Sequence, residues 1–459
     1  MQQYVIELSK YFIIICMAVF TYEGFAVFRY KEETAKNGIY VRQGILLFFI
    51  QFFSFLIICI KSENIEYLFF YAIVQIILFS TIALARMIYP KVNRLLLNNM
   101  CMLLGTGFVI LARLSFQKAI KQLVIVFLSL ILAMFLPQMM CKFTFLKKLK
   151  WAYAGVGIAA LSIVLILGEV THGSKLSFSV MGITFQPSEF VKIIFVFYLA
   201  AVFYEKTDFK QVFLSAVIAG MHVLVLAAST DLGSALIFFV VYVLMVYVAT
   251  KKVRYLLIGT AGGVAASVAA YYLFDHVKVR VLAWQDPWAY IDGKGYQITQ
   301  SLFAIGSGSW FGLGLYSGTP EVIPYVEADF IFSAIAEELG VIYGILIIFI
   351  CLSCFLMMIH IAVGLKDSFY RLIAFGLGII YIFQIFLTIG GGIKFIPLTG
   401  VTLPLISYGG SSVLTTLILF FVVQGIYMIR MQEGDRRVVS KKRTNGFDRK
   451  AEQTVKKES

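Results

Sequence analysis

The chain has 459 residues, of which 60% are hydrophobic and only 14% are charged, and its formal net charge is +14 at pH 7. This composition excludes an ordinary soluble globular protein. It indicates a helical protein that crosses a membrane many times, because an apolar run of about 20 residues spans a bilayer as a helix. Nucleic-acid binding is a poor explanation of the net charge, since the Lys and Arg residues are scattered between the apolar runs.

Thirteen apolar runs are long enough to be membrane spans. In chain order, they predict transmembrane helices at residues 11–28, 44–61, 67–87, 98–112, 122–140, 151–170, 189–204, 212–228, 234–250, 255–274, 340–362, 370–389 and 412–430. The basic connections 29–43, 142–150 and 251–254, and the tail after residue 430, then share one face, which the positive-inside rule makes cytoplasmic. Residues 171–188, 276–330 and 390–411 are expected outside, and the odd number of spans also places the N-terminus outside.

The chain divides into three parts by the distribution of its polar residues. Residues 1–97 carry no polar cluster comparable to those farther along, and we interpret them as an accessory bundle of three transmembrane helices. Residues 98–430 hold the polar clusters and form the expected functional core. Residues 431–459 are polar and basic, which predicts a disordered cytoplasmic tail close to an anionic inner leaflet.

The longest polar interruption covers residues 276–330. It contains the acids Asp286 and Asp292, and its aromatic residues argue against disorder. One interpretation is a structured lid with aromatic anchors at the membrane interface. We favour an active-site loop over a membrane-embedded cavity, because a loop of this length between spans is usually functional.

Two further polar positions begin predicted spans on the outer side. Pro187 suits the first turn of a helix, and Glu189 and Lys192 lie three residues apart on one face of that helix. Ionisable residues inside a membrane span are functional by default, so we expect this pair to point inward. Asp231 precedes the next inward span, where a helix cap and a functional acid are equally good interpretations.

The stretch 390–412 is too rich in glycine and proline to be a regular span. It contributes Lys394, and its Ser411 and Ser412 lie near a helix start, where backbone donors favour an anion. Lys175 adds another external cation. Together, these features suit a lipid-linked substrate with an anionic head such as a diphosphate, and a carboxylate such as Asp286 could take a proton from an attacking hydroxyl. The chemistry alone indicates a membrane transferase or a transporter of a lipid-linked anion.

Metal-binding patterns are absent from the sequence. The four histidines are widely separated, and the six cysteines lie within or at the ends of apolar segments. A diphosphate leaving group is compatible with a divalent cation, Mg²⁺ or Mn²⁺. The sequence shows no dedicated cage for one, so no metal ligand is assigned.

Five motifs make the chain resemble the SEDS family (shape, elongation, division and sporulation). They are FQPSEFVKI at 185–193, TDLGSAL at 230–236, DPWAYIDGKGYQITQSLFAIGSG at 286–308, EADFIFSAIAEELG at 327–340 and IPLTGVTLPLISYGGSS at 396–412. They occur in family order over about residues 98–430. The resemblance implies an all-α polytopic membrane protein with a ten-helix core, preceded here by about three extra helices, and a large extracellular loop at residues 276–330.

The resemblance also implies a peptidoglycan glycosyltransferase of the bacterial cytoplasmic membrane, with its active site facing outward. Such an enzyme polymerises lipid II into glycan strands and releases undecaprenyl diphosphate, in division, cell-shape or sporulation wall synthesis. Its expected partners are lipid II, the growing strand and a class B penicillin-binding protein. Asp286 is the expected base, with Asp292 in reserve. The expected substrate-binding residues are Lys175, Glu189, Lys192, Asp231, Asp329, Lys394, Ser411 and Ser412.

The chain departs from the family pattern at several positions. Glu327 and Ala328 stand where relatives often have a histidine and a threonine, and Tyr290 stands where many carry an acid. Two alternatives to the polymerase stay open: a lipid II flippase, and a non-catalytic scaffold for a wall-synthesis complex. A flippase needs a charged path through the bilayer, whereas the polar clusters here gather on the outer side. This asymmetry favours the enzyme.

Overall fold

The computed structural model describes residues 2–30, 32–171, 174–180 and 183–458, with side chains described at 7–30, 32–168, 177–178 and 185–434. Within these residues, thirteen helices are long and apolar enough to cross a membrane, which confirms the predicted number of spans. They belong to α1 (Gln2–Ala26), α2 (Glu33–Ser62), α3 (Glu66–Ile88), α4 (Arg94–Leu114), α5 (Phe116–Met134) with α6 (Leu136–Lys142), α7 (Lys150–Leu167), α8 (Pro187–Glu205), α9 (Phe209–Ala228), α10 (Leu232–Thr250), α11 (Val253–Leu273), α14 (Ile331–Val363), α15 (Ser368–Gly392) and α16 (Gly410–Glu458).

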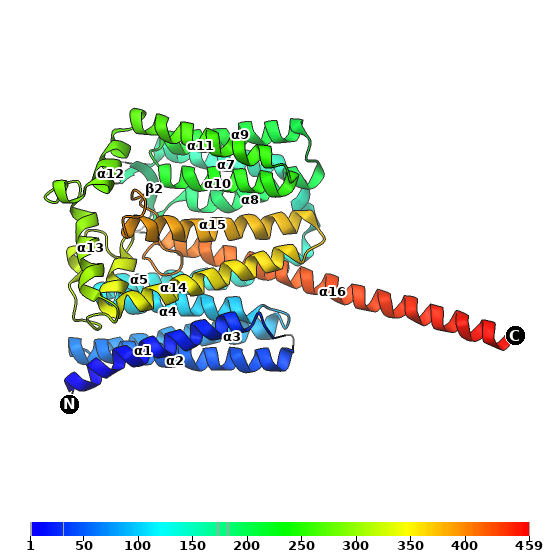
Figure 1. The fold of residues 1–459 in the computed structure, drawn as a ribbon, viewed down its shortest axis with the longest axis horizontal. Helices are drawn as coiled ribbons and strands as arrows, with labels where there is room; N and C mark the ends of the chain where they lie inside the picture. The colour runs from blue at the N-terminus through cyan, green and yellow to red at the C-terminus, as the bar shows by residue number, and fades with distance from the viewer. Residues whose placement is uncertain (1, 31, 172–173, 181–182, 459) are drawn as a thin grey trace.

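The spanning helices lie side by side along one direction, and the chain passes back and forth between two ends (Figure 1). Helices α1, α2 and α3 form one side of the molecule, α7, α9 and α11 form the opposite side, and α4, α14, α15 and α16 lie between them. Residues 95–112 of α4 are all buried, whereas α11 has no buried residue. Helix α4 therefore lies in the interior of the bundle, and α11 lies at its periphery.

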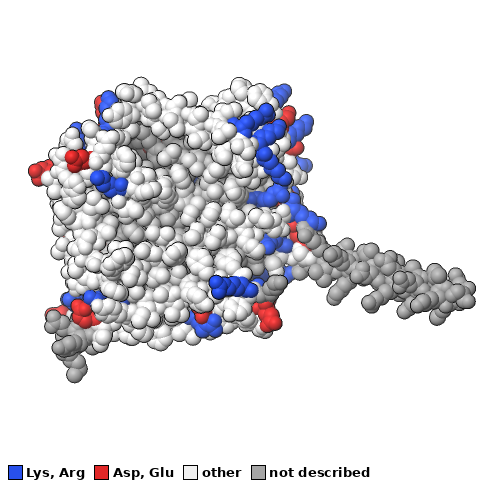
Figure 2. Space-filling model, in the orientation of Figure 1, with Lys and Arg blue, Asp and Glu red and all other residues white. Residues whose placement is uncertain are grey.

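Charged side chains distinguish the two ends. Most of the Lys and Arg side chains visible in Figure 2 gather at the end opposite α12 (Asp275–Gln285) and α13 (Tyr296–Gly308). This is the end at which α10 ends and α11 begins, at the basic connection 251–254. Helix α1 begins at the other end, the end at which α13 lies (Figure 1). The protein is a multi-pass membrane protein. The positive-inside rule predicts that the basic end is cytoplasmic, and we call the opposite end the outer end.

The predicted loop at 276–330 is largely helical. It contains α12 and α13, and the short 3₁₀ turns η2 (Trp288–Tyr290) and η3 (Pro320–Val322). Another outer segment forms a small antiparallel sheet of β1 (Glu169–Thr171), β2 (Ser174–Val180) and β3 (Ile183–Phe185), in the order β1-β2-β3. The cytoplasmic connection before α7 contains the 3₁₀ turn η1 (Thr144–Lys148).

Helix α14 is broken at Gly340, where φ is 91° and ψ is 158°. The segment 309–322, which we call the strap, fills the break. Val341 and Ile342 donate backbone hydrogen bonds to the carbonyls of Ser309 (3.0 Å) and Trp310 (3.2 Å). On the other side of the break, the strap donates from residues 313 and 314 to the carbonyls of residues 337 and 338. The break thus satisfies the backbone groups that a continuous helix would have paired.

The accessory bundle, α1–α3, is joined to the core by buried polar contacts. The Asn98 side chain donates to the Tyr40 carbonyl (3.1 Å) and to Gln43 Oε1 (3.2 Å). Hydrogen bonds of this kind hold transmembrane helices together in a lipid environment, where apolar contact alone has little driving force. Glu23 lies inside the first span, and its carboxylate is paired with Arg42 of α2. This ion pair explains how the span accommodates an acid.

Helix α16 is continuous from Gly410 to Glu458. The side chains of residues 435–459 lie outside the described part, so the predicted disorder of the tail at 431–459 stays a prediction, as does the division into 1–97, 98–430 and 431–459.

Candidate active site

A cavity of about 650 Å³ lies at the outer end of the bundle, the end of α12 and α13. Several described parts of the chain surround it: the starts of α8 and α10, the helix α12, the start of α13 with the residues before it, the segments 325–329 and 396–412, and Ser177 of β2. Its polar and charged lining residues are Ser177, Gln186, Glu189, Thr230, Asp231, Ser234, His276, Arg280, Lys294, Gln297, Tyr325, Asp329, Thr399, Thr402, Ser411 and Ser412. All five sequence motifs therefore contribute residues to this one cavity.

Three helices, α8, α10 and α16, begin at the cavity wall. Pro187 is the first residue of α8, as predicted, and Ser411 and Ser412 lie in the first turn of α16. The first N–H groups of a helix have no partner within that helix, and they carry the positive end of its dipole. The helix starts favour an anion at this wall, whereas the carboxylates of Glu189, Asp231 and Asp329 in the same lining oppose one.

The basic side chains of the cavity come from the outer segment. Arg280 of α12 donates to the Thr399 carbonyl at 3.2 Å, and its charge interacts with Asp329 and Asp231. Burial lowers the pKa of the Arg280 guanidinium, while the two aspartates raise it. Lys294 precedes α13 and is exposed at the same cavity.

His276 also lines the cavity, one turn before Arg280 on α12. Burial and the neighbouring Arg280 lower the pKa of its imidazole, against a smaller opposite effect of Asp275. Its Nε2 atom is buried and has no hydrogen-bond partner among the described residues.

Glu189 and Lys192 form a buried pair below the cavity. Lys192 Nζ donates to Glu189 Oε1 at 2.9 Å and to Gln384 Oε1 at 2.8 Å, and the Lys192 side chain is only 2% exposed. The predicted inward orientation is thus correct. Glu189 faces the cavity, while Lys192 lies behind it, against α15. The ammonium group is therefore one layer away from any ligand in the cavity and neutralises Glu189 from behind.

Asp231 is both a helix cap and a cavity residue, so the two interpretations of the sequence hold together. Its Oδ1 accepts from the Ser234 N–H at 3.0 Å at the start of α10, and its Oδ2 accepts from Ser188 Oγ at 3.1 Å. Asp231 therefore ties the starts of α8 and α10 together.

The two loop acids lie near cavity residues in the sequence but do not line the cavity. Asp286 ends α12, is exposed, and accepts one backbone hydrogen bond from Ala289 N at 3.2 Å. Asp292 is exposed in the turn before α13. Among the described residues that line the cavity, neither acid is present, whereas Asp329 is. Asp286 nevertheless follows Trp284, a lining residue, by only two positions.

Of the other predicted substrate-binding residues, the two serines line the cavity and the two lysines are not among its described lining residues. Ser411 Oγ accepts from Gln186 N at 2.9 Å, and Ser412 Oγ accepts from Thr402 Oγ1 at 2.7 Å, so both hydroxyls hold the wall together. Lys394 has a left-handed φ of 60°, its carbonyl accepts from Trp284 Nε1 at 3.1 Å, and the described cavity lining does not include it. The Lys175 side chain lies outside the described residues; its backbone pairs within the sheet.

Two lining residues hold an unfavourable backbone conformation. Thr230 has a φ of 62° and Tyr325 a φ of 59°, a region that β-branched and bulky residues avoid. Such strain persists only where surrounding contacts over-determine the conformation, and it is common at functional sites.

The sequence interpretation missed the three basic residues of the outer segment, His276, Arg280 and Lys294. The sequence did contain a pattern that could have revealed them, because Arg280 lies one turn from His276 in a polar stretch that leads into the DP motif. We assigned that stretch to a loop, in which side-chain directions cannot be predicted. Among the described residues, no group of three or more His, Cys, Asp or Glu side chains is placed to hold a metal ion.

Comparisons with known proteins connect this site to a family. A model of the cell cycle proteins FtsW, RodA and SpoVE matches residues 95–432. The peptidoglycan glycosyltransferase RodA of Mycobacterium tuberculosis is 35% identical over 288 residues, which cover 58% of this chain and 59% of that protein. Stage V sporulation protein E of Bacillus subtilis is 33% identical over 59% of this chain and 77% of its own length. The chain thus spans less than two thirds of the RodA relative.

Solved structures share the fold. A chain from a peptidoglycan synthase complex that coordinates polymerization and crosslinking is 24% identical, with a TM-score of 0.63 over 74% of this chain and 99% of its own. The rod shape determining protein RodA of Thermus thermophilus is 24% identical, with a TM-score of 0.56 over 74% of this chain and 98% of its own. Because the family model covers most of the chain, including every residue of the candidate site, the protein is a member of the FtsW/RodA/SpoVE family.

Proposed function

We propose that the protein is a peptidoglycan glycosyltransferase that polymerises lipid II at the outer face of the cytoplasmic membrane. The observation that carries the proposal is the cavity at the end opposite the basic face, with helix starts and basic side chains on its walls. A lipid-linked disaccharide has an anionic diphosphate between its sugars and its tail. The cavity offers groups of opposite charge at the membrane surface, where that diphosphate lies.

The diphosphate is held by Arg280 and Lys294, with the starts of α10 and α16 facing them across the cavity. Arg280 supplies a planar fork that suits two phosphate oxygens, and Lys294 supplies a movable point charge. The start of α16 adds the positive end of a helix dipole at a fixed position, while Asp231 already caps the start of α10. Asp231 and Asp329 hold Arg280 in place while the cavity is empty, and the diphosphate takes over part of that charge.

Asp286 is the proposed base for the acceptor hydroxyl of the sugar. It is exposed and accepts one backbone hydrogen bond, so a carboxylate oxygen can reach a substrate from outside the cavity. Asp329 is the competing choice, because it lines the cavity itself, although its charge is engaged with Arg280. The anomeric carbon of the growing strand loses undecaprenyl diphosphate as the acceptor oxygen bonds to it, and the hydroxyl proton passes to the carboxylate.

A class B penicillin-binding protein is the proposed partner. One structure with this fold belongs to a complex that combines polymerization and crosslinking. A glycan strand that leaves the cavity at the outer face would be presented directly to a transpeptidase on that face. The polymerase and its partner would then share one strand, with the membrane as the common platform.

The proposal is tested with purified protein in lipid vesicles and lipid II, with products resolved by strand length. Arg280→Met is expected to raise the KM for lipid II by about ten- to a hundredfold, because a charged hydrogen bond to phosphate is worth about 1.5–3 kcal/mol. Lys278→Met is the matched control, since it removes a basic residue of the same helix that lies outside the described cavity lining. Equal KM values for the two variants would contradict the assignment of the anion site.

A further inference from the structure

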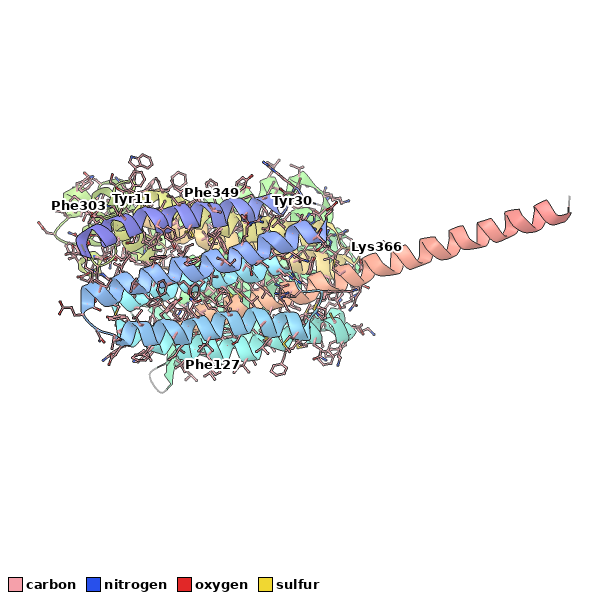
Figure 3. All side chains as sticks on the ribbon, turned by 90° about the horizontal axis from the view of Figure 1, so that it is seen from below. Tyr11, Tyr30, Phe127, Phe303, Phe349 and Lys366 are labelled. Atoms are coloured by element: carbon pink, nitrogen blue, oxygen red, sulfur yellow. The ribbon has the colours of Figure 1, made fainter. Side chains whose placement is uncertain are left out.

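The accessory bundle contacts the strap at the outer end of the molecule. Lys61 Nζ, at the end of α2, donates to Ser317 Oγ at 3.2 Å. The Tyr67 side chain of α3 lies close enough to Tyr316 for the two phenol groups to interact electrostatically. At the start of α1, the Tyr11 ring lies 5.4 Å from the Phe311 ring, centroid to centroid. Figure 3 shows Tyr11 at the same end of the molecule as Phe303 of α13. Each helix of the bundle thus contributes a contact to this one segment.

The core holds the strap from the opposite side. Arg113 of α4 donates to the Gly318 carbonyl at 3.0 Å, and its guanidinium lies 4.3 Å from the centre of the Tyr316 ring. The Thr319 N–H donates to Glu337 Oε1 at 2.9 Å. Tyr316 therefore interacts with the Arg113 cation of the core and with the Tyr67 side chain of the bundle. It has a φ of 62°, a conformation that needs such support.

The strap continues directly into the cavity wall. Ile323 and Val326 are buried, and Tyr325 and Asp329 line the cavity. The Asp329 N–H donates to the Tyr325 carbonyl at 3.1 Å, so these two lining residues belong to one turn. A displacement of the strap would therefore move both residues relative to α12 and α16.

We propose that the accessory bundle is a built-in clamp that positions the strap and, through it, the Tyr325–Asp329 turn of the cavity. The family model begins at residue 95, so α1–α3 lie outside the matched region. They nevertheless bond to the core along the whole bundle and to the strap at its outer end. Lys61 and Tyr67 are positioning residues in this account, because they act on the cavity through Tyr316 and Ser317.

Hydrogen exchange of the full-length protein in vesicles tests the clamp. The double variant Lys61→Met/Tyr67→Phe removes two hydrogen-bonding groups and keeps most of each side chain. We expect the amides of residues 313, 314 and 319, and those of the 325–329 turn, to exchange about tenfold faster, because local opening depends on such bonds. Lys61→Arg with Tyr67 intact is expected to keep the wild-type rates, since it preserves a donor.

Lys36→Met is the matched control, because Lys36 lies on the same helix as Lys61 and pairs with Glu33 of that helix. A general loss of stability would also speed exchange in α8 and lower the thermal unfolding midpoint, whereas release of the clamp leaves both at the values of the Lys36→Met variant. Unchanged exchange at the strap in the double variant would overturn the proposal. Faster exchange at the strap with an unchanged 325–329 turn would overturn its connection to the cavity.

An activity measurement extends the test and rests on the proposed polymerase function. The double variant is expected to raise the KM for lipid II by about three- to tenfold and to leave kcat within about twofold, since it misplaces a binding wall and leaves Asp286 and Arg280 intact. An unchanged KM with a faster-exchanging turn would overturn the assigned effect on binding. Absence of polymerisation by the wild type would refute the polymerase, and the exchange data would still decide the clamp.

Discussion

Substitution of Gly340 by alanine tests whether the break in α14 is required. The backbone at Gly340 has a φ of 91° and a ψ of 158°, a region that is essentially restricted to glycine and costs other residues about 1–3 kcal/mol. A Cβ atom would lie 2.5 Å from the Trp310 carbonyl oxygen and 2.6 Å from the Gly312 nitrogen. The strap would have to move away from α14.

That movement removes the hydrogen bonds from the N–H groups of Val341 and Ile342 to the strap, each worth about 1 kcal/mol. With the conformational strain, Gly340→Ala is expected to destabilise the protein by about 3–5 kcal/mol. The assay is thermal unfolding of the purified protein in detergent, followed together with hydrogen exchange of residues 309–322.

Gly306→Ala is the matched control, because no atom lies within 4 Å of a Cβ built at this helical glycine of α13. Alanine there is expected to match the wild type or to stabilise it by up to about 1 kcal/mol, through its higher helix propensity. If Gly340→Ala unfolded at the wild-type temperature with wild-type exchange in the strap, the break would be a dispensable feature and the reasoning would be refuted.

Two further substitutions test buried contacts of the core. Arg113→Met leaves Glu338, which is 1% exposed, without its ion-pair partner. The substitution is expected to lower the free energy of unfolding by about 3–5 kcal/mol. Wild-type stability of this variant in urea or thermal unfolding would contradict the pairing. Gly157→Ala places a Cβ atom 2.5 Å from Nε2 of the buried His222 and is expected to cost about 1–3 kcal/mol, whereas Gly155→Ala on the same helix has open space. Equal unfolding midpoints for these two alanine variants would show that α7 and α9 are not packed as described.

The spans could be predicted from the sequence because hydropathy reports them directly. Hydropathy alone did not predict the first part of α14, because the predicted span covers 340–362 whereas the helix begins at Ile331. Glu337 and Glu338 made the preceding turns look like part of the outer loop. They are buried because Thr319 N and Arg113 bond to them from segments far away in the chain, and such pairing cannot be predicted from local composition.

The candidate site was predictable by region and less so by residue. The motifs placed Asp231, Glu189 and Ser411 at helix starts, and all three line the cavity. Which side chains point into the cavity was harder to predict. Lys192 lies on the same helix face as Glu189, but its ammonium group is buried and donates a hydrogen bond to Gln384. Arg280 was missed for the opposite reason, since the polar stretch around it was assigned to a loop although it folds as α12.

Strand synthesis by carboxylate variants tests whether the protein polymerises lipid II with Asp286 as the base. Purified wild type, Asp286→Asn, Asp292→Asn and Asp329→Asn are incubated with lipid II, alone and with a class B penicillin-binding protein, and the products are resolved by length. The amide keeps the shape of each side chain and cannot accept the proton, so Asp286→Asn is expected to form no strands while it folds and binds lipid II as the wild type does. Normal strands from Asp286→Asn, or translocation of lipid II across vesicles by a wild type that forms no strands, would contradict the account.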